Sequence, residues 1–124
     1  MNKKLITEVA GIVEAPAGRV WAALAAELLP GDRRSAVEDA PTVEVAGHTI
    51  SVQGGWWYRG EWSVEPHPQG ALVVHRVFNV AEWMRWAVPL ANRMFAGFAE
   101  TTRQAFGELL ANVGRRAQAP ARPV

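Results

Sequence analysis

The stretch IVEAPAGRVWAAL, residues 12–24, contains an abrupt change of local pattern on which the rest of the fold depends. Before the change, residues 4–14 are rich in β-branched side chains, which favours a strand that ends at Ala15 and Pro16. After it, residues 17–29 carry apolar side chains at helical spacing, namely Val20, Trp21, Leu24 and Leu28. The sequence therefore predicts a strand followed directly by a short helix.

Downstream of a polar segment at residues 32–41, short apolar segments alternate with turn signals up to residue 80. Glycine and proline mark three breaks, at Gly47, at Gly54 and Gly55, and at residues 66–70 with the sequence PHPQG. These closely spaced reversals leave no room for crossover helices between the strands. The strands are therefore expected to pair in an antiparallel sheet.

The remainder of the chain is predicted to form one long helix over residues 82–117, with a bend at Pro89. Its apolar stripe runs through Leu90, Met94, Phe98, Ala105, Leu109 and Val113, and Phe95, Phe106 and Leu110 widen it. A stripe of this length must be buried on something large, and the sheet is the available surface. We therefore expect a single domain over residues 1–117 and a disordered tail over residues 118–124.

The composition excludes several classes of function. The chain has 124 residues, which is the size of one domain, and it contains no cysteine, so disulfides and thiolate metal sites are excluded. Its three histidines lack metal-ligand spacing, and its net charge of +1 gives no reason to expect nucleic acid as a partner. No segment has the length of a signal peptide core or of a membrane span. The expected location is the cytoplasm, with neither a metal nor another cofactor.

The order strand, helix, antiparallel strands and long C-terminal helix resembles the START-like, or SRPBCC, superfamily, which includes the Bet v 1-type proteins and the polyketide cyclase and dehydrase group. The resemblance is carried by Pro16, Val20 and Trp21 in the opening stretch, and by QGALVVHRVF at residues 69–78 before the long helix. This sequence departs from the family in strand number, because about four strands are visible after the first helix where six are usual.

The resemblance implies a helix-grip fold of the α+β class. In that fold a curved antiparallel sheet wraps around the long C-terminal helix, and a short helix follows the first strand. Between sheet and helix the family has an apolar cavity for lipids, sterols or polyketides. The scaffold alone does not fix the function, since carriers, receptors and cyclases share it.

An unusual concentration of aromatic side chains occurs at residues 54–62, with the sequence GGWWYRGEW. Strand alternation places Trp56, Tyr58 and Trp62 on one face and the charged residues on the other, so Trp57 is expected to face solvent. The aromatic set either fills a small core or lines a pocket for a flat apolar ligand. Met94, Phe98 and Thr102 of the long helix complete the expected ligand-binding set.

The three histidines receive different interpretations. His67 lies in the PHPQG turn and is expected to be exposed, whereas His48 begins a strand and could point into one end of the cavity. His75 shares a face with Val73 and Val77, and in the cavity it would be a neutral acid or base. If the strand were turned over, Arg76 would face inward instead and could hold an anionic group of a ligand.

Three functions agree with these features. The first is a protein that binds a small hydrophobic, polycyclic or polyketide-like molecule and assists its cyclisation or dehydration, with His75 or Tyr58 as the proton-transfer group. The second is a non-catalytic carrier or sensor of a hydrophobic ligand. The third is an interaction protein with a closed core. The chain is expected to act as a monomer or a homodimer.

Overall fold

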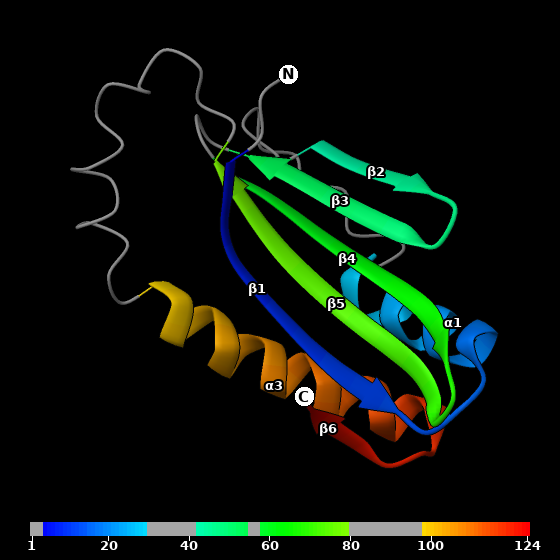
Figure 1. The fold of residues 1–124 in the computed structure, drawn as a ribbon. Helices are drawn as coiled ribbons and strands as arrows, with labels where there is room; N and C mark the ends of the chain where they lie inside the picture. Colours follow the sequence, from blue (N-terminus) through cyan, green and yellow to red (C-terminus); the bar gives the residue numbers. More distant parts are fainter. Residues whose placement is uncertain (1–3, 30–41, 55–57, 80–97) are drawn as a thin grey trace.

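The computed structural model describes residues 4–29, 42–54, 58–79 and 98–124 (Figure 1). In chain order, these residues form β1 (Lys4–Val13), α1 (Ala17–Leu28), β2 (Thr42–Ala46), β3 (Thr49–Gly54), β4 (Tyr58–His67), β5 (Gly70–Asn79), α3 (Phe98–Ala117) and β6 (Ala121–Pro123). The fold class is α+β, in agreement with the sequence-based prediction. The four strands β2 to β5 between the two helices match the four expected from the turn signals.

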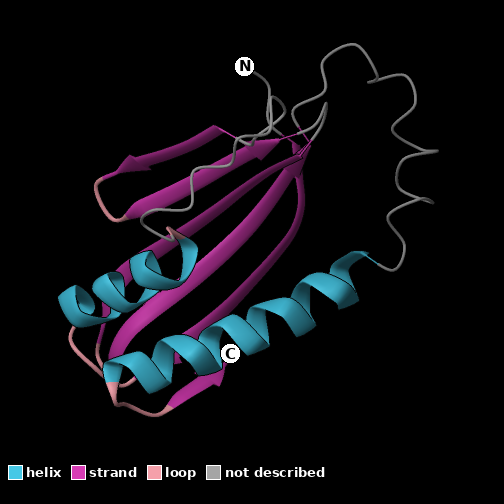
Figure 2. Cartoon of the chain, turned by 180° about the vertical axis from the view of Figure 1, so that it is seen from behind, coloured by secondary structure: helices cyan, strands magenta, loops and turns pink. Residues whose placement is uncertain are grey.

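The six strands form one curved, open sheet in the order β2-β3-β4-β5-β1-β6, and every neighbouring pair is antiparallel. The strands β2 to β5 are a meander, and β1 returns to pair with β5. Both helices cover the same face of the sheet, which we call the helix face (Figures 1 and 2). An antiparallel sheet with a C-terminal helix on it is compatible with a helix-grip fold.

The junction of β1 and α1 forms as the opening stretch predicts. Pro16 stands at the N-terminal cap position of α1, and its carbonyl oxygen accepts backbone hydrogen bonds from Arg19 and Val20. Opposite this junction, the β4–β5 hairpin needs glycine at position 70. Gly70 has φ +133°, and a Cβ atom there would overlap the backbone of Val13 and Ala15. The hairpin can therefore pack directly against the β1–α1 turn.

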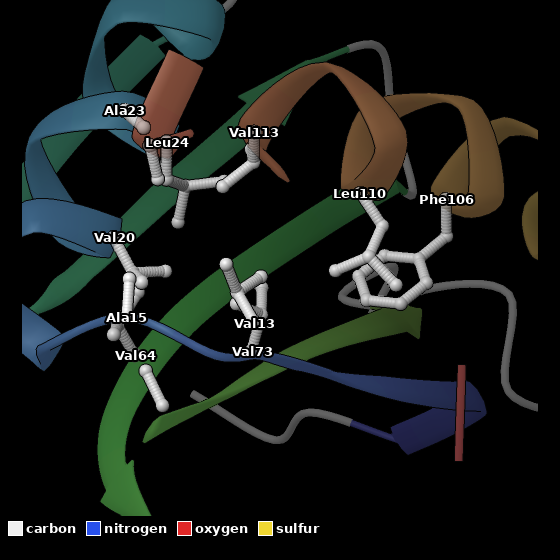
Figure 3. Close-up of a cluster of buried hydrophobic side chains, with 12 residues drawn as sticks. Val13, Ala15, Val20, Ala23, Leu24, Val64, Val73, Phe106, Leu110 and Val113 are labelled. Carbon is white, nitrogen blue, oxygen red and sulfur yellow. The ribbon is translucent and has the colours of Figure 1, made fainter. Parts of the chain in front are cut away.

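The hydrophobic core lies between the helix face and the two helices (Figure 3). Its members come from the strands β1, β4 and β5 and from both helices, and Val13, Val20, Leu24, Val73 and Val113 are all at 1% exposure or less. The two helices are also joined at their surfaces, because Arg116 of α3 lies 3.3 Å from Glu27 of α1. Packing of α1 and α3 on the helix face therefore shields that face of the sheet from solvent where the core lies.

The buried side of α3 differs from the stripe that the sequence predicts. Ala105 is exposed and Leu109 is only partly buried, whereas Thr102, Phe106, Leu110, Val113 and Ala117 are buried. The helix is therefore rotated so that the residues expected at the margin of the stripe become its centre. Residues 80–97, including Pro89, lie outside the described part of the chain.

The expectation of a disordered tail over residues 118–124 is wrong, because β6 adds a strand to the free edge of β1. Gln118 reverses the chain after α3 with φ 55°, and Pro120 then accepts a hydrogen bond from the Glu14 amide at 2.9 Å. The pairing continues to the Val124 amide, which donates to the Ala10 carbonyl at 3.0 Å. Composition suggested disorder, but an open strand edge offers hydrogen bonds to any backbone that reaches it.

Candidate functional site

A cavity of ≈ 320 Å³ lies between the helix face and α3, next to the end of α1. Its lining residues come from four elements: Leu28 of α1, Trp62 of β4, His75 and Val77 of β5, and Thr101, Thr102, Ala105, Phe106 and Leu109 of α3. Its size is near the lower end of small-molecule pockets, which span about 300–1,000 Å³. The lining is mainly apolar, with few polar groups.

The strand register brings two of the predicted residues together on the helix face. Trp62 of β4 and His75 of β5 are direct cross-strand partners. Their rings stack with centroids 4.2 Å apart and an interplanar angle of 8°. The ring of Phe106, on α3, is also nearly parallel to the imidazole of His75, with ring centroids 6.2 Å apart and an interplanar angle of 14°. The imidazole therefore has a defined orientation between sheet and helix.

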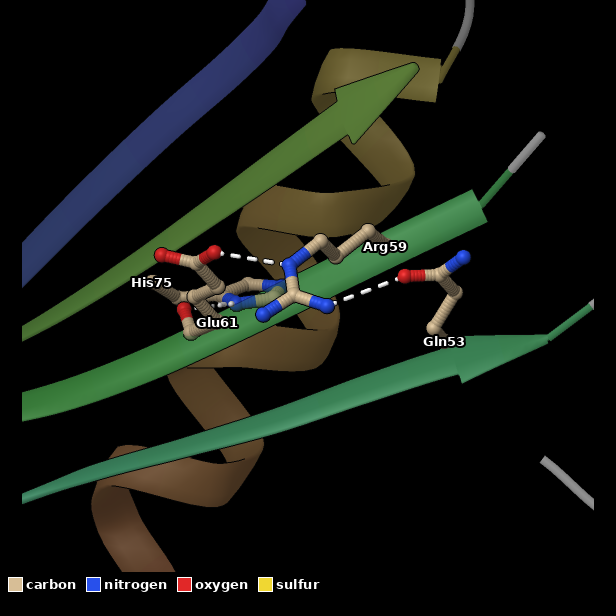
Figure 4. Close-up of polar contacts among 4 residues, drawn as sticks. All are labelled: Gln53, Arg59, Glu61 and His75. Atoms are coloured by element: carbon tan, nitrogen blue, oxygen red, sulfur yellow. Dashed lines mark hydrogen bonds and ion pairs between the residues drawn. The ribbon is translucent and has the colours of Figure 1, made fainter. Parts of the chain in front are cut away.

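His75 is 6% exposed, and its Nδ1 atom lies 3.1 Å from the carbonyl oxygen of Glu61 (Figure 4). A carbonyl oxygen can only accept, so Nδ1 carries a hydrogen and donates it. Burial lowers the pKa of His75 from its ordinary value of 6.5, and the hydrogen bond to Glu61 raises it by a smaller amount. The ring is therefore held neutral, with Nε2 as the unprotonated nitrogen.

The Glu61 peptide group is held in place from the opposite face of the sheet (Figure 4). Arg59 donates from Nε to the Glu61 carboxylate at 2.8 Å and from its terminal nitrogen to Gln53 at 2.9 Å. These contacts tie β3 to β4 at the position where His75 is anchored. The charged side chains of β4 thus lie on the outer face of the sheet, and their contacts fix the strand to which His75 is hydrogen-bonded.

The structure brings Trp62, His75 and Thr102 of the expected set to one cavity. The sequence left open which face of residues 71–80 points inward, and the structure shows that it is the face of His75. Arg76 points to the outer face, where its Nε lies 2.5 Å from Glu8. An inward Arg76 that binds an anionic group is therefore ruled out.

His48 does not join the cavity. It occupies the turn between β2 and β3, where it is exposed and its ring lies 5.3 Å from that of Trp21. The strand that it was expected to begin starts one residue later, at Thr49. His67 lies at the end of β4, and its Nδ1 accepts a hydrogen bond from the Gln69 amide at 3.0 Å.

For five further predicted residues, the structure does not describe the side chain. Trp56 and Met94 lie outside the described residues, as does Trp57, which was expected to face solvent. The backbone of Tyr58 pairs with Gly54 and Asn79, and Phe98 begins the described part of α3, but their side chains are not described. The inward orientation of Trp56 and Tyr58 remains a prediction.

Sequence reasoning did not assign Phe106, Leu28, Thr101, Ala105 or Leu109 to the site. Phe106 appeared only as a widening of the apolar stripe, although Thr102 and Phe106 are four residues apart and so share one side of a helix. That spacing was the signal available in the sequence. Leu28 could not be found in this way, because its place depends on how α1 packs against α3.

Phe106 also borders a second cavity, of ≈ 230 Å³, on the other side of α3. This cavity lies under Arg103 and along the β1 edge beyond the end of β6, lined by Glu8, Val9, Ala10, Arg103, Phe106, Pro123 and Val124. Its lining is more polar than that of the first cavity, and Phe106 is the one aromatic residue among the described residues that line it.

Within residues 4–29, 42–54, 58–79 and 98–124, there is no group of three or more histidines or carboxylates that could hold a metal ion. The helices of the same ranges include none that is long and apolar enough to cross a membrane. Comparisons of the chain with models of protein families, with curated proteins and with solved structures found no match.

Proposed function

We propose that this protein binds a small, flat, largely apolar molecule in the cavity between the sheet and α3. The observation that carries the proposal is the stack of Trp62, His75 and Phe106 against an open space of ≈ 320 Å³. Aromatic walls with a few polar groups are the usual composition of small-molecule pockets. The resemblance to the helix-grip proteins adds polycyclic or polyketide-like compounds as the ligand class.

A second candidate is catalysis of a cyclisation or dehydration within the same cavity. It is favoured by the neutral imidazole of His75, whose unprotonated Nε2 could take a proton from a bound substrate. Carrier and catalyst differ in one readout: a carrier releases the ligand unchanged. A catalyst releases a cyclised or dehydrated product, which the variant His75→Gln would no longer form at an appreciable rate.

Binding can be tested with N-phenyl-1-naphthylamine, a neutral fluorophore whose emission rises in apolar sites. The wild-type protein should bind it, and Trp62→Ala should weaken binding by about tenfold because it removes an aromatic wall. Trp21→Ala is the matched control, since Trp21 also contacts a histidine and packs against the core but does not line the cavity.

A further variant tests the position of the site without removing a core contact. Ala105 is exposed at the cavity, so Ala105→Trp should fill the space with an indole and block binding while the fold is kept. Absence of fluorophore binding by the folded wild-type protein would refute the proposal. Equal weakening by Trp62→Ala and Trp21→Ala would place the binding site elsewhere.

A further inference from the structure

The polar groups that line the main cavity form a short and unusual set. Among the described lining residues there is no Asp, Glu, Lys or Arg, and His75 is the ionisable group. The other polar groups are the hydroxyls of Thr101 and Thr102 and the indole N–H of Trp62. A charged ligand would therefore lose its hydration without meeting an opposite charge, which disfavours carboxylates and ammonium groups.

The hydrogen bond of His75 determines what its ring can offer to a ligand. Nδ1 donates to the Glu61 carbonyl, and this is the one hydrogen bond that His75 makes within the described residues. Nε2 of the neutral ring keeps its lone pair and can only accept. Because Nδ1 is held against the backbone of β4, Nε2 at the opposite side of the ring is the nitrogen left for the cavity.

The stacking contacts limit a ligand further. Trp62 lies parallel to the imidazole at 4.2 Å, and Phe106 also packs against it, so a ligand is expected to meet the edge of the imidazole rather than its face. A hydrogen bond in the plane of the ring is then the available polar contact. Its partner on the ligand must be a donor, and in this uncharged cavity it must also be neutral.

We propose, building on the function proposed above, that the cavity selects planar ligands with a phenol or enol hydroxyl, which donates its hydrogen to Nε2 of His75. The volume of ≈ 320 Å³ suits a ligand of about two or three fused rings. An ether or ketone at the same position would place a second acceptor against the lone pair of Nε2, leaving both without a partner. The site thus distinguishes a hydroxyl from its methylated form.

Three probes test this selection on the wild-type protein: 2-naphthol, 2-methoxynaphthalene and naphthalene, each titrated by calorimetry. We expect 2-naphthol to bind about tenfold more tightly than 2-methoxynaphthalene, because the latter leaves Nε2 buried and unpaired. Hydrophobicity alone would produce the opposite order, since the methyl ether is the more apolar compound. Similar affinities for all three probes would overturn the selection but keep the proposed cavity. Failure of all three to bind would refute the proposed function itself.

The variant His75→Leu removes the acceptor and keeps a similar apolar volume. It should bind 2-naphthol and 2-methoxynaphthalene with affinities within about twofold of each other. His67→Leu is the control, because it removes a histidine from the end of β4, outside the cavity, and it should keep the tenfold preference. Survival of the preference in folded His75→Leu would show that another group, such as Thr102, receives the hydroxyl.

A measurement on the unmodified chain covers the case in which His75→Leu does not fold. Nitrogen NMR of protein with labelled histidine should show His75 with hydrogen on Nδ1 and none on Nε2. The Nε2 resonance should shift when 2-naphthol is added and stay in place with 2-methoxynaphthalene. A hydrogen on Nε2 in the free protein, or the same shift with both probes, would overturn the proposal.

Discussion

His75 combines burial with a single fixed hydrogen bond, and the two act on its pKa in opposite directions. Removal from water disfavours the imidazolium and lowers the pKa, while the Glu61 carbonyl favours a proton on Nδ1 and raises it by less. Charged side chains on β4, β5 and β1 beside His75 are paired with one another on the outer face: Glu61 with Arg59, and Arg76 with Glu8. The neutral ring is therefore the stable form in the folded protein.

The lowered pKa predicts how stability depends on pH. The unfolded state binds a proton at His75 below a pH of about 6.5, whereas the folded state resists it, so stability falls as the pH drops through this value. The loss continues until the pH reaches the lower pKa of the folded state. In urea unfolding at a series of pH values, His75→Leu should show a smaller loss than the wild type over this range.

His67→Leu provides the comparison for this pH series. His67 is the last residue of β4 and belongs to neither the core nor the main cavity, so its replacement removes a histidine without changing the surroundings of His75. If the two variants had identical slopes, the acid sensitivity of the protein would come from groups other than His75.

At the scale of elements, the approach of α3 to the sheet depends on Gly11 of β1. A Cβ atom at this position would overlap Cδ2 of Leu110, and it would lie 3.0 Å from the carbonyl oxygen of Arg122. Leu110 is 2% exposed, so its side chain has little space into which it could move. The missing side chain thus allows a helix, β1 and β6 to meet at one point.

We predict that Gly11→Ala lowers the free energy of unfolding by about 1–3 kcal/mol, which is the usual cost of overpacking a core. Gly107→Ala is the matched control on α3, because nothing lies within 4 Å of its Cβ position. Gly107→Ala should raise the free energy of unfolding by about 0.5–1 kcal/mol, since alanine loses less backbone entropy than glycine when it enters a helix. Denaturant unfolding of both variants would measure the contrast, and a neutral Gly11→Ala would contradict the tight contact.

At the scale of the whole molecule, the strand order separates a protected centre from an exposed edge. β5 is paired on both sides, with β4 and β1, and its residues Val73 and Val77 are each 1% exposed. Among the described residues β2 is paired on one side only, and Val43 and Val45 are 46% and 53% exposed. More of the fold must therefore open to expose the backbone amides of β5 than to expose those of β2.

Hydrogen exchange should reveal this difference. Amides of β5 should exchange only when the whole sheet opens, whereas those of β2 should exchange by local opening. We expect the exchange rates of paired amides in β2 to exceed those in β5 by at least about a hundredfold, a gap of roughly 3 kcal/mol. Equal protection of the two strands would mean that another part of the protein, or a partner, covers β2.

The sequence by itself determined the local structure wherever a residue limits its own backbone. Pro16 and the β-branched residues before it located the β1–α1 junction, and the glycines and prolines located the hairpins. Strand alternation in β4 also placed Trp62 opposite its charged neighbours. These features need no distant contact, because steric limits on the backbone act within a few residues.

Only the tertiary structure decided the features that depend on distant partners. Residues 71–80 carry apolar side chains on both faces of the strand. The pairing of His75 with Trp62 and the packing of Phe106 were therefore needed to identify the face that points inward. The orientation of α3 involves the close contact of Leu110 with Gly11 of β1, and β6 forms by pairing with the edge of β1. The cavity arises for the same reason: its walls come from segments far apart in the chain, and only packing brings them together.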